Sequence, residues 1–93
     1  MESRTLGKTG LSVSKVGFGG AGIGHVWGKT TNEECVNSVL RAVNLGINFF
    51  DTSPMYGGGQ SEFHLRLGLE VIRNQAFITT KVRLQPYTLQ WVE

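Results

Sequence analysis

This sequence of 93 residues contains little cysteine and little proline. It also has no long apolar run and no large excess of charge of either sign. A single cysteine, Cys35, excludes an intrachain disulfide framework and fits a reducing compartment, so we expect a cytoplasmic protein. No apolar run approaches the length of about 18 residues that a membrane-spanning helix needs, and the first residues lack the apolar core of a signal peptide. A formal net charge of +2 is too small to indicate a nucleic-acid or membrane partner.

Glycine, in contrast, is abundant, with 13 residues against only 2 prolines, and it gathers in two places along the chain. The sequence is 40% hydrophobic and 17% charged, which is typical of a globular protein of at most one domain at this length. Short aromatic and β-branched runs alternate with helical patterns. That alternation predicts an α/β fold with a parallel sheet.

The first part of the chain predicts a small hairpin and then a glycine-rich strand end. Residues 4–14 contain two short apolar segments around a glycine-containing turn. Residues 17–22 match the string GxGxxG, which in a dinucleotide-binding fold opens a helix and is followed by an acid about 20 residues on. Here the next helical pattern begins only near Thr31, and Asp51 lies too far along. The glycines are better explained as a strand end that another backbone or a ligand approaches closely.

Residues 32–45 carry the clearest helical signal. Thr31 followed by Glu34 forms a capping box, and Gly46 is placed to terminate the helix. Apolar residues recur at the i, i+3, i+4, i+7 spacing of one helical face: Val36, Val39, Leu40 and Val43. Cys35 adjoins this face, and we expect it to pack there rather than to react.

A second helix is expected from about Ser61, with Ser61 as its N-cap and Glu62 in its first turn. The apolar residues that follow alternate strictly, which favours a strand instead: Phe63, Leu65, Leu67, Leu69 and Val71. Three apolar residues also share one helical face: Leu65, Leu69 and Ile72. Because parallel strands need a crossover of about a dozen residues, we expect the helix. Residues 88–93 predict the start of another helix.

Two of the expected strands end in charged residues. The strand over 47–51 ends in Asp51 and leads to Tyr56, and the strand over 77–81 ends in Lys81. Parallel neighbours lie about 4.8 Å apart, so we expect these three side chains to converge at one end of the sheet. An ammonium group stabilises a nearby phenolate, and a carboxylate can orient that ammonium. A tyrosine so placed can exchange a proton with the oxygen of a carbonyl or alcohol while hydride moves at carbon.

Spacing alone leaves a structural interpretation open for each of these residues. Asp51 could cap the turn that follows it, Tyr56 could be an ordinary loop aromatic, and Lys81 could be a solvated strand end. Glycines 57–59 suggest a phosphate-binding loop, but the GxxxxGK[ST] pattern is missing. No metal site is predicted, because His25 and His64 have no metal-ligand partners at useful spacing in the sequence. We expect both histidines in surface or loop positions.

Taken together, these segments resemble the aldo-keto reductase family. The resemblance implies an α/β chain that forms the N-terminal portion of a (β/α)₈ TIM barrel, closed at its bottom by an N-terminal β-hairpin and incomplete in 93 residues. Residues 1–93 would be a partial NADP-dependent oxidoreductase domain with the hairpin, two βα units and the third strand. The segments that carry the resemblance are 46–53, 56–57, 61–62 and 79–81, with 4–11 and 16–19 in the same style.

The resemblance also implies a role for each residue that matches the family motif. Tyr56 would be the general acid/base, Lys81 would lower the pKa of Tyr56, and Asp51 would pair with Lys81 and approach the nicotinamide ribose. Gly20 and Ala21 would touch the cofactor, which we expect to be NADP(H), with NAD(H) as the second choice. The reaction implied is reversible hydride transfer between this cofactor and a carbonyl or alcohol substrate.

Two further expectations follow from the resemblance. The loop 22–29 and the run 53–56 are most similar to sugar dehydrogenases of the family, which implies a small-molecule substrate such as L-galactose, L-fucose or a related aldose. The family's catalytic histidine and most of its cofactor phosphate contacts fall beyond residue 93. The alternative is therefore a truncated non-catalytic fragment, or a regulatory or binding module derived from the family. We expect the isolated chain to aggregate readily and to show no turnover.

Overall fold

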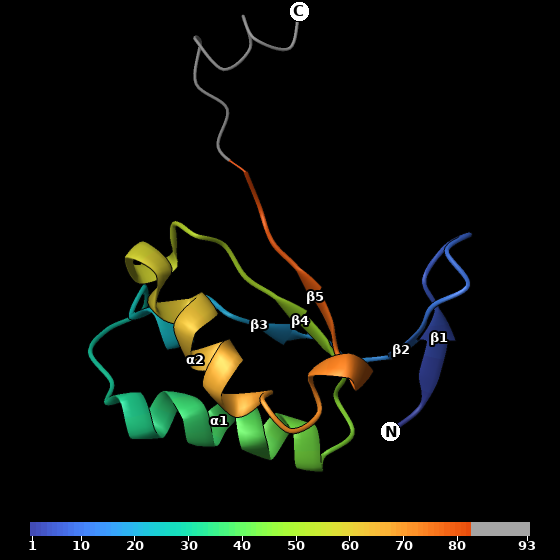
Figure 1. Ribbon diagram of the computed structural model, residues 1–93, viewed down its shortest axis with the longest axis horizontal. Coiled ribbons are helices and arrows are strands. Elements are labelled where there is room, and N and C mark those ends of the chain that lie inside the picture. Colours follow the sequence, from blue (N-terminus) through green and yellow to red (C-terminus); the bar gives the residue numbers. More distant parts are fainter. Residues whose placement is uncertain (83–93) are drawn as a thin grey trace, which may run out of the picture.

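The computed structural model describes residues 1–82 as two small sheets with helices packed on one of them (Figure 1). Strands β1 (Ser3–Thr5) and β2 (Ser12–Ser14) pair antiparallel as the expected hairpin. A parallel sheet follows in the order β3-β4-β5, and its strands are β3 (Phe18–Gly19), β4 (Phe49–Asp51) and β5 (Phe77–Thr79). These strands are shorter than the sequence predicts. The helix expected over 88–93 lies outside the described residues.

Two α-helices connect the parallel strands and cover the same face of the sheet (Figure 1). Helix α1 (Asn32–Asn44) joins β3 to β4, and α2 (Gln60–Gly68) joins β4 to β5. Three short 3₁₀ turns complete the connections: η1 (Gly22–Gly24), η2 (Tyr56–Gly59) and η3 (Arg73–Gln75). Within residues 1–82, no helix combines the length and apolar character needed to cross a bilayer.

The hydrophobic core lies between the parallel sheet and the two helices. Phe50, in the middle of the central strand, has no exposed surface, and burying such a side chain contributes about 1.5–3 kcal/mol. The buried members of the core are Ile23, Cys35, Val39, Ala42, Phe50, Leu65, Leu69 and Ala76. The packing role expected for Cys35 is therefore confirmed.

Helix α1 begins with the predicted capping box, and its buried face matches the expected one only in part. Val39 is buried and Val43 packs against the core, as expected. The Thr31 hydroxyl accepts from the Glu34 amide at 3.1 Å, and the Glu34 carboxylate accepts from the Thr31 amide at 3.3 Å. Leu40, which we expected on the buried face, is 44% exposed. The buried face is made by Cys35, Val39 and Ala42, whose spacing fits a helix equally well. The small side chains among them allow α2 to approach.

Helix α2 confirms the helical prediction, but its expected N-cap was wrong. The capping position is held by Gly59, which has a left-handed φ of 100°, and no side chain caps the helix. Ser61 is instead fully buried one residue inside the helix. The apolar alternation was misleading because Leu65 and Leu69 are buried, whereas Val71 is 93% exposed.

The two histidines differ in position. His25 lies in the loop after η1, as expected, and is half-buried. The surface or loop position expected for His64 was wrong, because its side chain is fully buried on α2. The polar ring is accommodated there because both of its nitrogens have hydrogen-bonding partners, the carbonyl of Ile23 and the side chain of Asn32.

A glycine allows α1 and α2 to pack closely. A Cβ atom on Gly68 would lie 2.5 Å from Cγ1 and 2.7 Å from Cβ of Val39, which is too close for two carbon atoms. Val39 has no exposed surface and cannot turn away without disturbing the core. The glycine that weakens α2 as an isolated helix is thus required where the two helices meet.

We predict that Gly68→Ala destabilises the fold, because overpacking of this kind costs about 1–3 kcal/mol. The measurement is the midpoint of urea unfolding, followed by circular dichroism. Gly19→Ala is the matched control, since a Cβ at Gly19 meets no atom within 4 Å. Equal midpoints for the two variants would contradict the proposed helix contact.

Candidate active site

The register of the parallel sheet places three strand ends in one row. Gly19 pairs with Asp51, and Asp51 pairs with Thr79. The row extends one step further, since the Thr52 amide donates to the Thr79 carbonyl at 2.9 Å. Lys81 follows two residues after Thr79, just beyond the end of β5. The carboxyl ends of β4 and β5 therefore present their polar side chains at the same edge.

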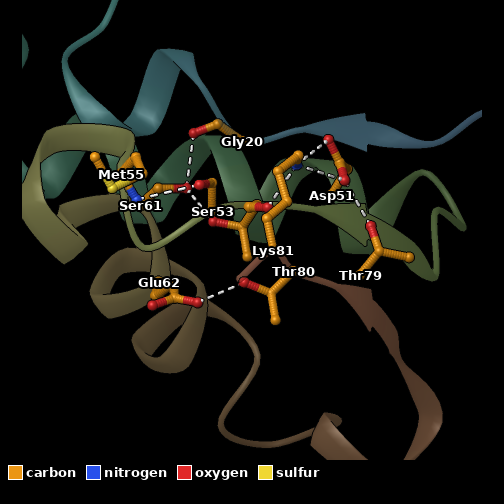
Figure 2. A network of polar contacts seen from close by, with 10 residues as sticks. Gly20, Asp51, Ser53, Met55, Ser61, Glu62, Thr79, Thr80 and Lys81 are labelled. Carbon is orange, nitrogen blue, oxygen red and sulfur yellow. Dashed lines mark hydrogen bonds and ion pairs between the residues drawn. The ribbon is translucent and has the colours of Figure 1, made fainter. Parts of the chain in front are cut away.

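Asp51 and Lys81 form an ion pair at this edge (Figure 2). The Lys81 ammonium lies 3.1 Å from Oδ1 and 3.2 Å from Oδ2 of Asp51, and it also donates to the Thr52 carbonyl at 2.7 Å. About half of each side chain is exposed, 49% for Lys81 and 53% for Asp51. Water screens a pair of this exposure, so its value lies in orientation more than in stability. The carbonyl of Thr52 fixes the direction of the ammonium group.

A hydroxyl that was not expected from the sequence also binds the carboxylate of Asp51. The Thr79 hydroxyl donates to Asp51 Oδ1 at 2.6 Å (Figure 2). This hydrogen bond is the main reason that the pKa of Asp51 lies below its ordinary value, and Lys81 lowers it further. The available signal was strand alternation, which places Thr79 and Lys81 on the same side because they are two residues apart.

The same contacts favour the charged form of Lys81. The hydrogen bond to Asp51 is the main cause of a raised Lys81 pKa, and the charges of Asp51 and Tyr56 add to it. The pair therefore stabilises the folded chain above the ordinary aspartate pKa and below the ordinary lysine pKa. This stabilisation is lost as the pH falls through the lowered Asp51 pKa, or rises through the raised Lys81 pKa.

Tyr56 lies beside this ion pair. Its ring centroid is 5.1 Å from the Lys81 ammonium, within the range of a cation–π contact. The convergence of Asp51, Tyr56 and Lys81 that we expected from the sequence is thus present, whereas their chemical roles stay predictions. The Tyr56 amide donates to the Ser53 carbonyl at 3.1 Å, which anchors the start of η2.

A close contact between two 3₁₀ turns holds Tyr56 in place. A Cβ atom on Gly24, at the end of η1, would lie 2.7 Å from the backbone and from Cβ of Tyr56. Only a glycine therefore lets η1 pack against the first residue of η2. The glycine-rich stretch after β3 serves the close backbone approach that the sequence indicated, and here the approaching backbone is that of Tyr56.

Gly20, one of the two residues expected to touch a cofactor, is used inside the protein. Its amide donates to the Asp51 carbonyl at 2.7 Å, and its carbonyl accepts from the Ser61 hydroxyl at 2.7 Å (Figure 2). Ser61 also lies 2.7 Å from the Thr52 hydroxyl. This buried network ties β3, β4 and α2 together, which explains why Ser61 is not a cap. Ala21 is less buried than Gly20, and a cofactor contact at either residue stays a prediction.

Comparison with known proteins agrees with this arrangement. Residues 15–92 match the sequence model of the Aldo/keto reductase family. The chain belongs to this family. An aldo-keto reductase from Bacillus halodurans, solved in its holo form, superimposes on this chain with a TM-score of 0.79 at 30% identity. The superposition covers 91% of this chain and 28% of the reductase chain. The fold is therefore part of the (β/α)₈ barrel of the aldo-keto reductases, as the sequence indicated.

Relatives in this family include sugar dehydrogenases. L-galactose dehydrogenase from Arabidopsis thaliana is 48% identical over 84 residues, which are 87% of this chain and 26% of the relative. D-threo-aldose 1-dehydrogenase from a Pseudomonas species is 35% identical over 74 residues, which are 80% of this chain and 20% of the relative. The chain thus spans about a quarter or less of the length of these relatives.

We predict that Thr79→Val raises the pKa of Asp51 toward its ordinary value, because the hydrogen bond that stabilises the carboxylate most is lost. The carboxyl carbon signal of Asp51, followed by NMR as the pH is lowered, measures this change. Thr80→Val is the matched control, since the Thr80 hydroxyl donates to Glu62 at 2.8 Å instead. A pKa that is unchanged in Thr79→Val, or raised as much in Thr80→Val, would contradict the assignment.

Proposed function

We propose that this chain supplies the proton-transfer residues of a nicotinamide-dependent oxidoreductase that interconverts a carbonyl and an alcohol. One observation carries the proposal: the Lys81 ammonium is bound to Asp51 at 3.1 Å and lies 5.1 Å from the ring of Tyr56. This arrangement places an ammonium group beside the tyrosine, and a nearby cation favours the charged form of an acidic group. Membership of the aldo-keto reductase family supports the reaction class.

In the proposed mechanism, Tyr56 is the general acid/base. For carbonyl reduction its hydroxyl donates a proton to the substrate oxygen, and for alcohol oxidation its phenolate accepts that proton. Lys81 stabilises the phenolate by its charge. Asp51 and the Thr52 carbonyl keep the ammonium oriented, at 3.1 and 2.7 Å. Each of these groups acts only if a bound substrate reaches the exposed edge of the sheet where they meet.

The site also has a group that fits the sugar portion of a nicotinamide cofactor. Asp51 Oδ1 accepts from both Thr79 and Lys81, whereas Oδ2 accepts only from Lys81 among the described residues. Because a carboxylate oxygen has two lone pairs, Oδ2 can accept from a ribose hydroxyl. The cofactor, NADP(H) or NAD(H), would supply or accept the hydride. Asp51 would thus orient both the ammonium and the cofactor.

We further propose an aldose as the substrate class. The support is the relationship to L-galactose dehydrogenase and to D-threo-aldose 1-dehydrogenase, at 48% and 35% identity. Both relatives are named as dehydrogenases of a sugar. The alternative, a non-catalytic fragment or binding module, would not need Asp51, Tyr56 and Lys81 held together in this way.

A chimera tests the proposal in a complete barrel. The matching N-terminal segment of the Arabidopsis L-galactose dehydrogenase is replaced by residues 1–93 of this chain, and reduction of the cofactor is followed by absorbance with L-galactose present. We expect the chimera to be active. Tyr56→Phe should lower kcat by about 100-fold or more, since general acid–base catalysis contributes 10²–10⁴.

Tyr87→Phe is the matched control, because it makes the same exchange at the other tyrosine of the chain. It should leave kcat unchanged. Full activity in the Tyr56→Phe chimera would contradict the acid/base role. A folded chimera without activity would favour the non-catalytic alternative.

A further inference from the structure

All the cysteine and histidine residues of this sequence gather in one place, although they lie far apart along the chain. The sequence contains one cysteine and two histidines. The ligand atoms of His25, Cys35 and His64 all lie within 4.8 Å of one another. The three residues come from the end of η1, the first turns of α1 and the middle of α2. The fold thus creates a cluster that the spacing in the sequence conceals.

We propose that His25, Cys35 and His64 form a binding site for Zn²⁺, with three protein ligands and one open position. Two imidazoles and a thiolate are donors that Zn²⁺ prefers. In tetrahedral zinc sites these donor atoms lie about 3.4–3.6 Å apart, given bonds of about 2.0–2.3 Å. The widest present separation, up to 4.8 Å, therefore has to close by about 1.2–1.4 Å. His25 can supply this movement, since it is half-buried and lies in a loop.

His64 shares one feature with metal-binding histidines, a ring nitrogen bound to a backbone carbonyl. Its Nδ1 lies 2.6 Å from the Ile23 carbonyl, which can only accept, so this nitrogen carries a proton. The lone pair is then on Nε2, the nitrogen that faces the side-chain amide of Asn32 at 2.9 Å. A ring N–H donated to a backbone carbonyl fixes the tautomer and raises the basicity of the other nitrogen. A metal ion would replace Asn32, which is a neutral and exposed partner.

The other two ligands share a single hydroxyl. Thr30 Oγ1 lies 3.0 Å from His25 Nδ1 and 3.0 Å from Cys35 Sγ. Without metal, Thr30 bridges the ring and the thiol. With metal, Cys35 would bind as thiolate and release its proton to solvent. A cavity of about 340 Å³, lined in part by Ile23, Thr30 and Cys35, borders the cluster and gives a route for the ion and for a water ligand.

The site would be separate from the proposed active site but mechanically connected to it. A bound ion would join η1 to α1 and α2 through one ligand on each. Because Gly24, the residue before His25, packs against Tyr56, the ion would also hold the turn that supports Tyr56. The inference does not depend on the proposed function, since metal binding needs neither cofactor nor substrate.

The test uses Co²⁺ as a spectroscopic substitute for Zn²⁺ on the purified 93-residue chain. We expect one equivalent of Co²⁺ to produce thiolate-to-metal charge-transfer absorption and the intense visible bands of a tetrahedral site, and Zn²⁺ to abolish both. Cys35→Ser should eliminate the charge-transfer absorption. His25→Ala should weaken binding at least about tenfold, which is the lower limit for loss of even a supporting outer partner.

Glu33→Gln is the control for surface binding, because Glu33 is an exposed carboxylate two residues before Cys35 in the sequence and is not a member of the cluster. It should bind Co²⁺ like the unsubstituted chain. Circular dichroism confirms that each variant keeps its helices, and His25→Ala provides the test if replacement of a buried residue prevents folding. A folded chain without charge-transfer absorption, or equal affinity in His25→Ala, would overturn the proposal.

Discussion

The register of the three parallel strands is the constraint on which the rest of the structure depends. It aligns Gly19, Asp51 and Thr79, and this alignment brings the Thr79 hydroxyl and Lys81 to Asp51. A shift of one residue would turn Asp51 to the opposite face of the sheet and separate it from Lys81. Phe50 resists such a shift, since the same slip would remove its fully buried ring from the core. Packing on the helix side thus keeps the polar residues at the strand ends aligned.

At this edge of the sheet, buried hydrogen bonds support side chains that are exposed to solvent. The hydrogen-bond network of Gly20, Ser61 and Thr52 is buried and therefore shielded from water. Asp51 and Lys81 are half exposed and remain available to a bound molecule. Rigid support below an open polar edge is the arrangement expected of a site that binds small molecules at strand ends.

Sequence reasoning succeeded where a local rule acts alone. The capping box at Thr31 and the βαβ alternation are short-range signals, and both are present in the fold. It was less successful where tertiary contacts decide. Ser61 looks like an N-cap, but its hydroxyl is taken by Gly20, a residue 41 positions away. His64 looks like a polar surface residue because its two partners, Ile23 and Asn32, are distant in the chain. Spacing cannot reveal a partner that only folding supplies.

The contact between η1 and Tyr56 has a consequence for protein engineering of this chain. Because Gly24 admits no side chain, the loop that follows β3 can be altered beyond this point only if its first turn is retained. Residues from Val26 to Lys29 are exposed and can be exchanged to reshape a binding surface. A loop transplanted without the glycine would displace the tyrosine itself. The exposed residues after this glycine and the turn that holds Tyr56 can therefore be altered separately.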